Sequence, residues 1–306
     1  TTGAGNTFIG GLAGTANTTA DNNTAVGVSA LAANTTGTPN TAVGYQALDA
    51  NTTGHRNTAI GVGSLGANTT ASDNTALGYA SLLTNSTGHS NVAIGHDAME
   101  ANTTGSENTA VGFDALKANT TADNNTAIGR LAGVGITTGH SNTILGAAAM
   151  QTNSTGVGNV AVGISALAVA QGTDNVAVGR TAGDAVTTAA NCVLMGTDAG
   201  GSLTTGGNNV AIGKDSLSQC TDGTEHAALG FKALTAVTTG HLNVGIGSYA
   251  GAGLTTASSN VHVGPYAGQN ITTGTSNTSL GYYALRNVSS GTVSYTHLRA
   301  HETVLD

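Results

Sequence analysis

A five-residue phrase, Asn-Thr-Ala-Val-Gly or a close variant, returns along this chain at an almost constant interval. With its first residue as position 1, the phrase begins at residues 6, 23, 40, 57, 74, 91, 108, 125, 142, 159, 175, 192, 209, 226, 243, 260 and 277. Fifteen of the sixteen intervals are 17 residues long, and the interval from 159 to 175 is 16. Such a period is typical of stacked units that contact only their neighbours. The chain is therefore expected to be a repeat array.

The repeat is too short for two helices and a turn, and its recurring Gly and β-branched residues disfavour helix. Short strands joined by tight turns fit 17 residues better, with one repeat per coil. We therefore predict an all-β fold, a parallel β-solenoid of the β-roll or β-helix type, with about 17 coils of 17 residues.

The array is predicted to be one elongated domain spanning residues 1–292. The chain opens at position 13 of a repeat, so we expect the array to be truncated at both ends. Residues 293–306 fit no repeat position, and we expect them to be a non-repeat tail, either a sequence artefact or disordered.

Several repeat positions are nearly invariant. Position 2 is Thr or Val except at Ala227, and position 4 is always Val, Ile, Leu or Met. Alternate residues of a strand share a face, so we predict that positions 2 and 4 form the core. Position 5 is Gly in every repeat, which indicates a positive φ or a backbone contact too close for a Cβ atom. The small residues at positions 3 and 8 indicate either a narrow interior or a seam against another chain.

Positions 9 and 12 vary together. Leu or Met at position 9 accompanies Asn at position 12, as in Leu31 and Asn34. Gly at position 9 usually accompanies an apolar residue at position 12, as in Gly133 and Ile136. The simplest cause is that one large apolar group fills the same space from either position.

Asn at position 1 forms the most suggestive polar column. Stacked amides can hydrogen-bond along an axis, so we predict a structural ladder that only Cys192 and His226 interrupt. Its members are Asn6, Asn23, Asn40, Asn57, Asn74, Asn91, Asn108, Asn125, Asn142, Asn159, Asn175, Asn209, Asn243, Asn260 and Asn277.

A second Asn column carries N-glycosylation sequons at position 12. The candidate glycosylation sites are Asn17, Asn34, Asn51, Asn68, Asn85, Asn102, Asn119 and Asn153. A glycan on every coil, about 4.8 Å from the next, would be crowded. We therefore favour the alternative that the turn itself requires Asn-Thr-Thr.

The composition and the motifs argue against several classes of function. The net charge is −8 without a basic cluster, so we expect no nucleic-acid partner. No apolar run approaches the roughly 20 residues that span a bilayer, so we expect no membrane insertion. No Ser/His/Asp or Cys/His constellation recurs, so we predict no catalytic residues, no cofactor and no enzymatic activity. The two cysteines, Cys192 and Cys220, are expected to be buried thiols.

We also predict no metal site. The histidines at position 16 belong to non-adjacent coils and cannot converge on one ion; they are His55, His89, His140 and His241. Two pairs of position-7 aspartates fall in neighbouring coils, Asp97 with Asp114 and Asp198 with Asp215. Two carboxylates fall short of the six to eight oxygens that Ca²⁺ takes.

Two families carry similar repeats. The Asn-Val-Ala-Ile-Gly of residues 91–95 resembles the repeat in head domains of trimeric autotransporter adhesins, which form a left-handed parallel β-roll. The longer form, Asn40-Thr-Ala-Val-Gly-Tyr-Gln-Ala-Leu48 followed by Asn51-Thr-Thr-Gly54, resembles arrays in tail-fibre-like proteins of phages and bacteria. Those arrays often end in an intramolecular chaperone domain that drives trimerisation. The resemblance covers residues 1–292 and implies a trimer.

The predicted function is that of a non-enzymatic structural segment of a fibre, either an adhesin or a tail-fibre shaft. We expect it to be extracellular, at a cell surface or on a virion. Its expected partners are its own copies, as a homotrimer or an end-to-end filament, and a cell-surface receptor or glycan. One alternative is a self-assembling glycosylated filament. The second is an ice- or glycan-binding solenoid with a flat Thr/Asn face, although with position 2 in the core only one Thr rank would face outward.

Overall fold

The computed structural model describes residues 2–290 and 295–297. The chain divides into two compact units, Thr1–Val157 (unit 1) and Gly158–Asp306 (unit 2). Within the described residues the regular elements are strands of three residues each, without a helix. Accordingly, that part of the chain contains no helix able to cross a membrane.

One strand occurs in each repeat, at positions 2 to 4. Unit 1 contains β1 (Thr7–Ile9), β2 (Thr24–Val26), β3 (Thr41–Val43), β4 (Thr58–Ile60), β5 (Thr75–Leu77), β6 (Val92–Ile94), β7 (Thr109–Val111), β8 (Thr126–Ile128) and β9 (Thr143–Leu145). Unit 2 contains β10 (Val160–Val162), β11 (Val176–Val178), β12 (Val193–Met195), β13 (Val210–Ile212), β14 (Ala227–Leu229), β15 (Val244–Ile246), β16 (Val261–Val263), β17 (Thr278–Leu280) and β18 (Tyr295–His297).

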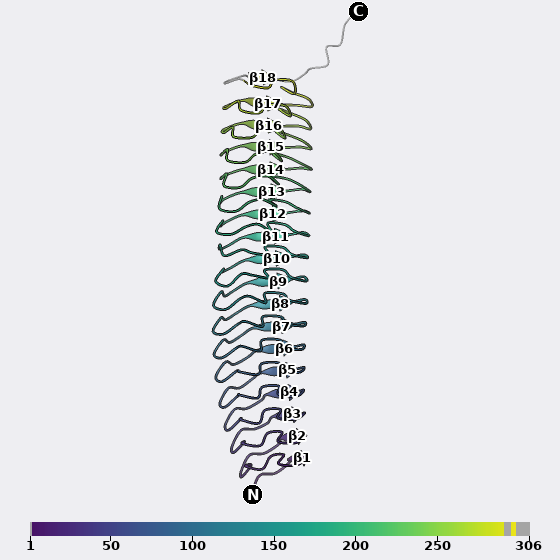
Figure 1. The fold of residues 1–306 in the computed structure, drawn as a ribbon, viewed down its shortest axis with the longest axis vertical. Helices are drawn as coiled ribbons and strands as arrows, with labels where there is room; N and C mark the ends of the chain where they lie inside the picture. The colour runs from purple at the N-terminus through teal and green to yellow at the C-terminus, as the bar shows by residue number, and fades with distance from the viewer. Residues whose placement is uncertain (1, 291–294, 298–306) are drawn as a thin grey trace, which may run out of the picture. The chain divides into compact units, whose positions relative to one another are not determined.

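Within each unit every strand pairs in parallel with the next one along the chain, so that the strands stack one per coil (Figure 1). Equivalent repeat positions are partners, as for Thr24 with Thr41 in unit 1 and Val176 with Val193 in unit 2. The prediction of an all-β parallel solenoid with 17-residue coils is confirmed.

The single 16-residue coil keeps this register. Val160 pairs with Val176, and the side chain of Asn159 bonds the carbonyl of Gly172, 13 residues on instead of 14. The missing residue therefore belongs to the turn that follows position 12. A turn can lose one residue without changing which side chains face inward, whereas a strand cannot.

The core lies on the other side of the strands from the one predicted. Position 3 is buried in every coil except the first, where Phe8 is half-buried, while positions 2 and 4 are half-buried or exposed throughout. The predicted alternation is confirmed, but the prediction that positions 2 and 4 form the core is wrong, because it rests on hydrophobicity alone. The coil is narrow and takes the Ala of position 3, for example Ala42 and Ala110, both fully buried. The small residues at positions 3 and 8 therefore line the interior and form no seam.

The remaining volume is filled from positions 9 and 12. Leu31 and Leu116 at position 9 are completely buried. Where position 9 is Gly, the apolar residue at position 12 lies close by: a Cβ on Gly133 would come within 3.1 Å of Ile136 and 2.9 Å of Ile144. One large group thus fills the interior from either position, as the covariation predicts.

Both reasons for the Gly at position 5 hold together. Gly129 has a φ of 138°, and a Cβ there would lie 2.7 Å from the carbonyl carbon and oxygen of Gly146 in the next coil. Such a separation is too short for real atoms, so the stacking of coils itself requires Gly.

Strand β18 pairs in parallel with β17, Thr278 opposite Tyr295, at the same 17-residue offset. These three residues continue the array beyond residue 292, inside the segment expected to be a non-repeat tail. The rest of 293–306 lies outside the described residues, so the expectation for that segment stays a prediction.

Candidate functional site

The outward side of the strands exposes apolar side chains in coil after coil of each unit. In each unit we call the position-2 and position-4 side chains of its strands the strand face, β1–β9 in unit 1 and β10–β17 in unit 2. Position 4 is apolar in every coil, yet none of these side chains is buried, and nine are between 37% exposed (Ile60) and 59% exposed (Ile9). In unit 1 the position-4 residues are Ile9, Val26, Val43, Ile60, Leu77, Ile94, Val111, Ile128 and Leu145, and in unit 2 Val162, Val178, Met195, Ile212, Leu229, Ile246, Val263 and Leu280.

Position 2 of the strand face differs between the units. It is Thr in eight of the nine strands of unit 1, with Val92 as the exception. In unit 2 it is Val in six of the strands β10–β17, with Ala227 and Thr278 as the exceptions. Large side chains at position 6, such as Tyr45, are exposed as well. An exposed apolar surface that recurs on every coil marks an interaction site in a soluble protein.

The position-1 asparagines lie inside the coils and join each coil to the next. The Oδ1 atom of Asn23 accepts the backbone N–H of Asn40 at 2.8 Å, and its Nδ2 atom donates to the carbonyl of Gly37 at 3.0 Å. The same two bonds recur in successive coils of unit 1 from Asn6 onward. Each amide therefore bonds one backbone donor and one backbone acceptor inside the coil, where buried polar groups need partners.

The position-12 asparagines of unit 1 form a second column beside the first. Asn51 donates through Nδ2 to Oδ1 of Asn34 at 2.9 Å and to the carbonyl of Gly54 at 3.1 Å. That carbonyl also accepts from Asn40, at 2.8 Å. The turn carbonyl at position 15 thus links the two columns.

All eight asparagines that carry sequons are buried. Their Nδ2 atoms, the atoms that glycosylation would modify, face the interior and in most coils donate hydrogen bonds there. A glycan would have to be attached before the coil folds, and it would replace these bonds. The geometry thus gives a structural reason for Asn at position 12 that is independent of glycosylation.

The two residues that interrupt the position-1 column, His226 and Cys192, differ in how well they replace the hydrogen bonds of Asn. The imidazole of His226 replaces the amide atom for atom: Nδ1 accepts the N–H of Asn243 at 3.2 Å, and Nε2 lies 2.7 Å from the carbonyl of Gly240 as its donor. The thiol of Cys192 lies 3.6 Å from the carbonyl of Gly206, a weak contact. Burial raises the pKa of Cys192 and raises that of Cys220 to about 11, so both thiols are protonated and unreactive at neutral pH.

Two buried histidines distinguish unit 2. Burial lowers the pKa of His226 and of His262 to about 4. His262 occupies core position 3, where its Nδ1 atom lies 2.7 Å from the Ser279 hydroxyl and its Nε2 atom has no hydrogen-bond partner. Gly251 and Gly268 provide the space, because a Cβ on either would touch the imidazole. Sequence reasoning missed His262, although a ring at a position that is usually Ala, flanked by Gly at position 9, was a readable signal.

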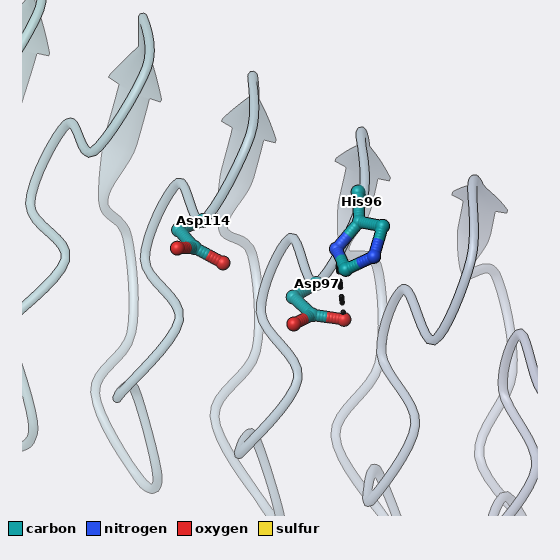
Figure 2. A group of neighbouring side chains, drawn as sticks. All are labelled: His96, Asp97 and Asp114. Carbon is teal, nitrogen blue, oxygen red and sulfur yellow. Dashed lines mark ion pairs between the residues drawn. The ribbon is translucent and has the colours of Figure 1, made fainter.

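One group of metal-ligand type occurs among the described residues. His96, Asp97 and Asp114 bring one ligand atom each within 4.8 Å of one another on neighbouring coils of unit 1 (Figure 2). The ammonium of Lys117 already lies among these carboxylates, 2.7 Å from Asp97 and 3.2 Å from Asp114. Its hydrogen bond to Asp97 is the main cause of its raised pKa, so it stays charged. The lysine supplies the positive charge that a cation would bring, and we propose no metal site here.

The other candidate residues lie apart. The position-16 histidines are exposed in turns and lie apart from one another. His140 lies 3.2 Å from the hydroxyl of Ser141, and Nδ1 of His241 accepts the N–H of Thr224 in the preceding coil at 3.1 Å. Asp198 accepts a hydrogen bond from the hydroxyl of Thr181, and Asp215 belongs to no three-ligand group of the described residues.

Comparison with known proteins found no family model that matches the chain and no curated relative that matches it.

Proposed function

We propose that this chain is a non-enzymatic structural segment of an extracellular or virion fibre, an adhesin or tail-fibre shaft, whose copies associate side by side through the strand face. The observation that carries the proposal is the apolar residue at position 4 of every coil, pointing outward and partly exposed. Selection for solubility alone would place polar residues there. If a second copy packs its own strand face against this one, the apolar residues of both copies are buried.

Three features support a structural role in a fibre. Parallel backbone pairing continues from coil to coil within each unit. The position-1 amides add side-chain bonds to that ladder. The repeats are alike enough for copies to match along a common axis, as closed homo-oligomers require. Three copies is the number implied by the resemblance to adhesin heads, in which the strand faces would surround a shared axis.

The test is sedimentation equilibrium of the purified chain and of Ile128→Asp. We expect an oligomer for the parent chain and a shift to lower mass for the variant, because a carboxylate in an apolar interface is costly to desolvate. Thr138→Asp is the matched control, an exposed turn residue of the same coil, and should leave the mass unchanged. A parent chain that is monomeric at micromolar concentration would refute the proposal.

A second candidate function, ice binding, gains from the corrected orientation of the strands. Position 2 faces outward, so unit 1 presents a rank of Thr side chains beside the apolar rank of position 4. Hydroxyl and methyl groups repeated about every 4.8 Å can order water. This role needs a strand face open to solvent, so it competes with lateral association. Thermal hysteresis by a monomeric chain would favour it, and an oligomer without hysteresis would exclude it.

A further inference from the structure

The last coils of unit 2 carry an aromatic patch, which we define as Phe231, Tyr249, Tyr266, Tyr282 and Tyr283. The chain has only 7 Tyr and 3 Phe, so half of these residues gather at positions 6 and 7 of four successive coils. The rings of Tyr249, Tyr266 and Tyr283 stack in a row, with centroids 5.3 and 5.1 Å apart. Phe231 and Tyr282 meet this row edge-on and are the most exposed of the five.

Neither the core nor the backbone explains these rings. Their positions lie outside the core, which takes residues from positions 3, 8, 9 and 12. The backbone at position 7 is left-handed, with φ of 57° at Tyr249 and 59° at Tyr266. This conformation favours Gly, Asn and Asp and is strained for bulky residues. Position 7 is left-handed in the other coils too, where it holds residues as different as Gln46, Asp97 and Leu131. The coil therefore does not require an aromatic residue at this position, and three tyrosines there in successive coils point to a role of the surface.

Two cations flank the row. The guanidinium of Arg286 lies 4.3 Å from the centre of the Tyr283 ring, and its Nε atom donates to Gln269 at 3.0 Å. The ammonium of Lys232 lies 5.4 Å from Phe231 and 5.9 Å from Tyr249. Neither cation forms an ion pair with a carboxylate of the described residues, in contrast to Lys117 of unit 1.

The surroundings are unusually free of negative charge. Residues 226–292 contain no Asp or Glu, although the whole chain carries a net charge of −8. Stacking on an aromatic ring holds a guanidinium in place while its remaining nitrogens can bind a carboxylate in a forked geometry. The patch therefore combines ring surface, phenolic hydroxyls and two cations without an ion pair among the described residues, although Asp215 occupies the position of Lys232 in the preceding coil.

We propose that the aromatic patch and its two cations bind an acidic polysaccharide, a linear sugar chain that bears carboxylates. Arg286 and Lys232 bind the carboxylates, and the exposed rings pack against the apolar faces of the sugars. Each of the four coils contributes at least one ring, and the two cations lie in the first and last of these coils, which suits an extended polymer better than a single compact ligand. An acidic polypeptide would meet the same charges, and the experiment separates it. This binding goes beyond the structural role proposed above and does not depend on it.

The experiment is affinity gel electrophoresis of the full chain in gels that contain alginate, dextran or poly-L-glutamate. We expect retardation by alginate that weakens as salt is raised, because charged contacts are screened. Arg286→Gln should weaken alginate binding about tenfold or more, because a charge-assisted hydrogen bond is lost. Tyr282→Ser should weaken it less. The matched controls are Arg130→Gln and Phe113→Ser, another cation–ring pair on the surface of unit 1, and both should bind as the parent does.

Four results would overturn the proposal: no retardation by alginate, equal retardation by dextran, equal loss in the unit 1 controls, or equal retardation by poly-L-glutamate. The last would assign the patch to an acidic protein partner. Circular dichroism of each variant shows that the coils remain folded, and sedimentation of Arg286→Gln shows whether association is intact. Loss of glycan binding with an unchanged mass would separate this site from the strand face.

Discussion

The two units are built from the same type of backbone coil, but they differ in the side chains that fill its interior and in the hydrogen bonds that those side chains form. In unit 1, position 12 is Asn in eight of nine coils, so two amide columns meet at the turn carbonyls. In unit 2, position 12 is apolar or Cys throughout, as at Val186 and Leu203, and the turn carbonyl of Ala257 accepts from a single amide, that of Asn243. The comparison teaches that the position-1 column and the position-5 Gly define the coil, whereas its interior tolerates either amides or aliphatic groups.

The units also differ in what they expose and in what they bury. The strand face of unit 1 is mainly Thr beside aliphatic residues, and that of unit 2 is mainly Val beside aliphatic residues. Every described histidine of unit 1 is exposed, whereas unit 2 buries His226 and His262. Stability against acid should therefore differ between the units.

The largest difference is expected on acidification. The pKa of each buried histidine falls from about 6.5 in the unfolded chain to about 4 in the folded one, so the unfolded chain binds more protons between these values. The stability that the neutral rings contribute is complete above pH 6.5 and is lost as pH falls toward 4. The loss is on the order of 3 kcal/mol per histidine. Hydrogen exchange followed by mass spectrometry between pH 7 and 4 should show unit 2 opening first.

His226→Asn sharpens this test, because it restores the amide of the repeat. It should remove a large part of the acid sensitivity of unit 2 and leave exchange in unit 1 unchanged. Equal opening of both units in acid, or no change in the variant, would contradict the account.

Exchanging the two interiors should have the next largest effect. Leu203→Asn gives unit 2 the residue that unit 1 prefers, but Val186 and Cys220 at the adjacent position 12 offer no amide partner. The loss of a buried aliphatic side chain and the burial of an unpaired amide should together cost about 4 kcal/mol. Urea unfolding, with exchange measured on the coils around residue 203, checks the value. A cost below about 1 kcal/mol would show that the interior of unit 2 is not closely packed.

Breaking the amide column in unit 1 should cost less. Asn108→Ala removes the acceptor of the Asn125 N–H and one of the two amide donors to the carbonyl of Ala122, so we expect a loss of about 1–3 kcal/mol. Thr104→Ala, an exposed turn residue, is the control. A melting curve of Asn108→Ala that matches the control would reject the buried ladder.

The smallest effect is expected at the acidic cluster of unit 1. Lys117→Met removes the ammonium that three carboxylates share, those of Asp97, Glu100 and Asp114. These groups are partly exposed, so the change in unfolding free energy should stay below about 1 kcal/mol in physiological salt and should grow as salt is lowered. A larger loss that is independent of salt would mean that Lys117 acts through packing of its aliphatic stem.

The coil was predictable from sequence because its constraints repeat. Every coil has Gly at position 5, the period is nearly fixed, and each strand is short and rich in β-branched residues. A parallel solenoid meets all three constraints, and its register follows from the period. The inward side of the strand was not predictable from hydrophobicity alone, since Val and Ile at position 4 serve an outward face. The width of the coil determines which side of the strand faces inward, and the small size of most position-3 residues indicates that side.

The candidate sites were less predictable than the fold. Both Asn columns could be read from the sequence, but the sharing of the Gly54 carbonyl by Asn40 and Asn51 requires coordinates. The aromatic patch is not apparent in the repeat pattern, because its rings are at two different repeat positions. Only stacking of the coils brings Tyr266 and Tyr282 together.

The central claim is that the strand face is covered by other copies of the chain. Electron microscopy of the purified protein in cross-section tests this claim most directly. The account predicts several solenoids around a common axis, three by the resemblance to adhesin heads, with the strand face of each unit turned toward that axis. A single solenoid with its strands open to solvent would contradict it.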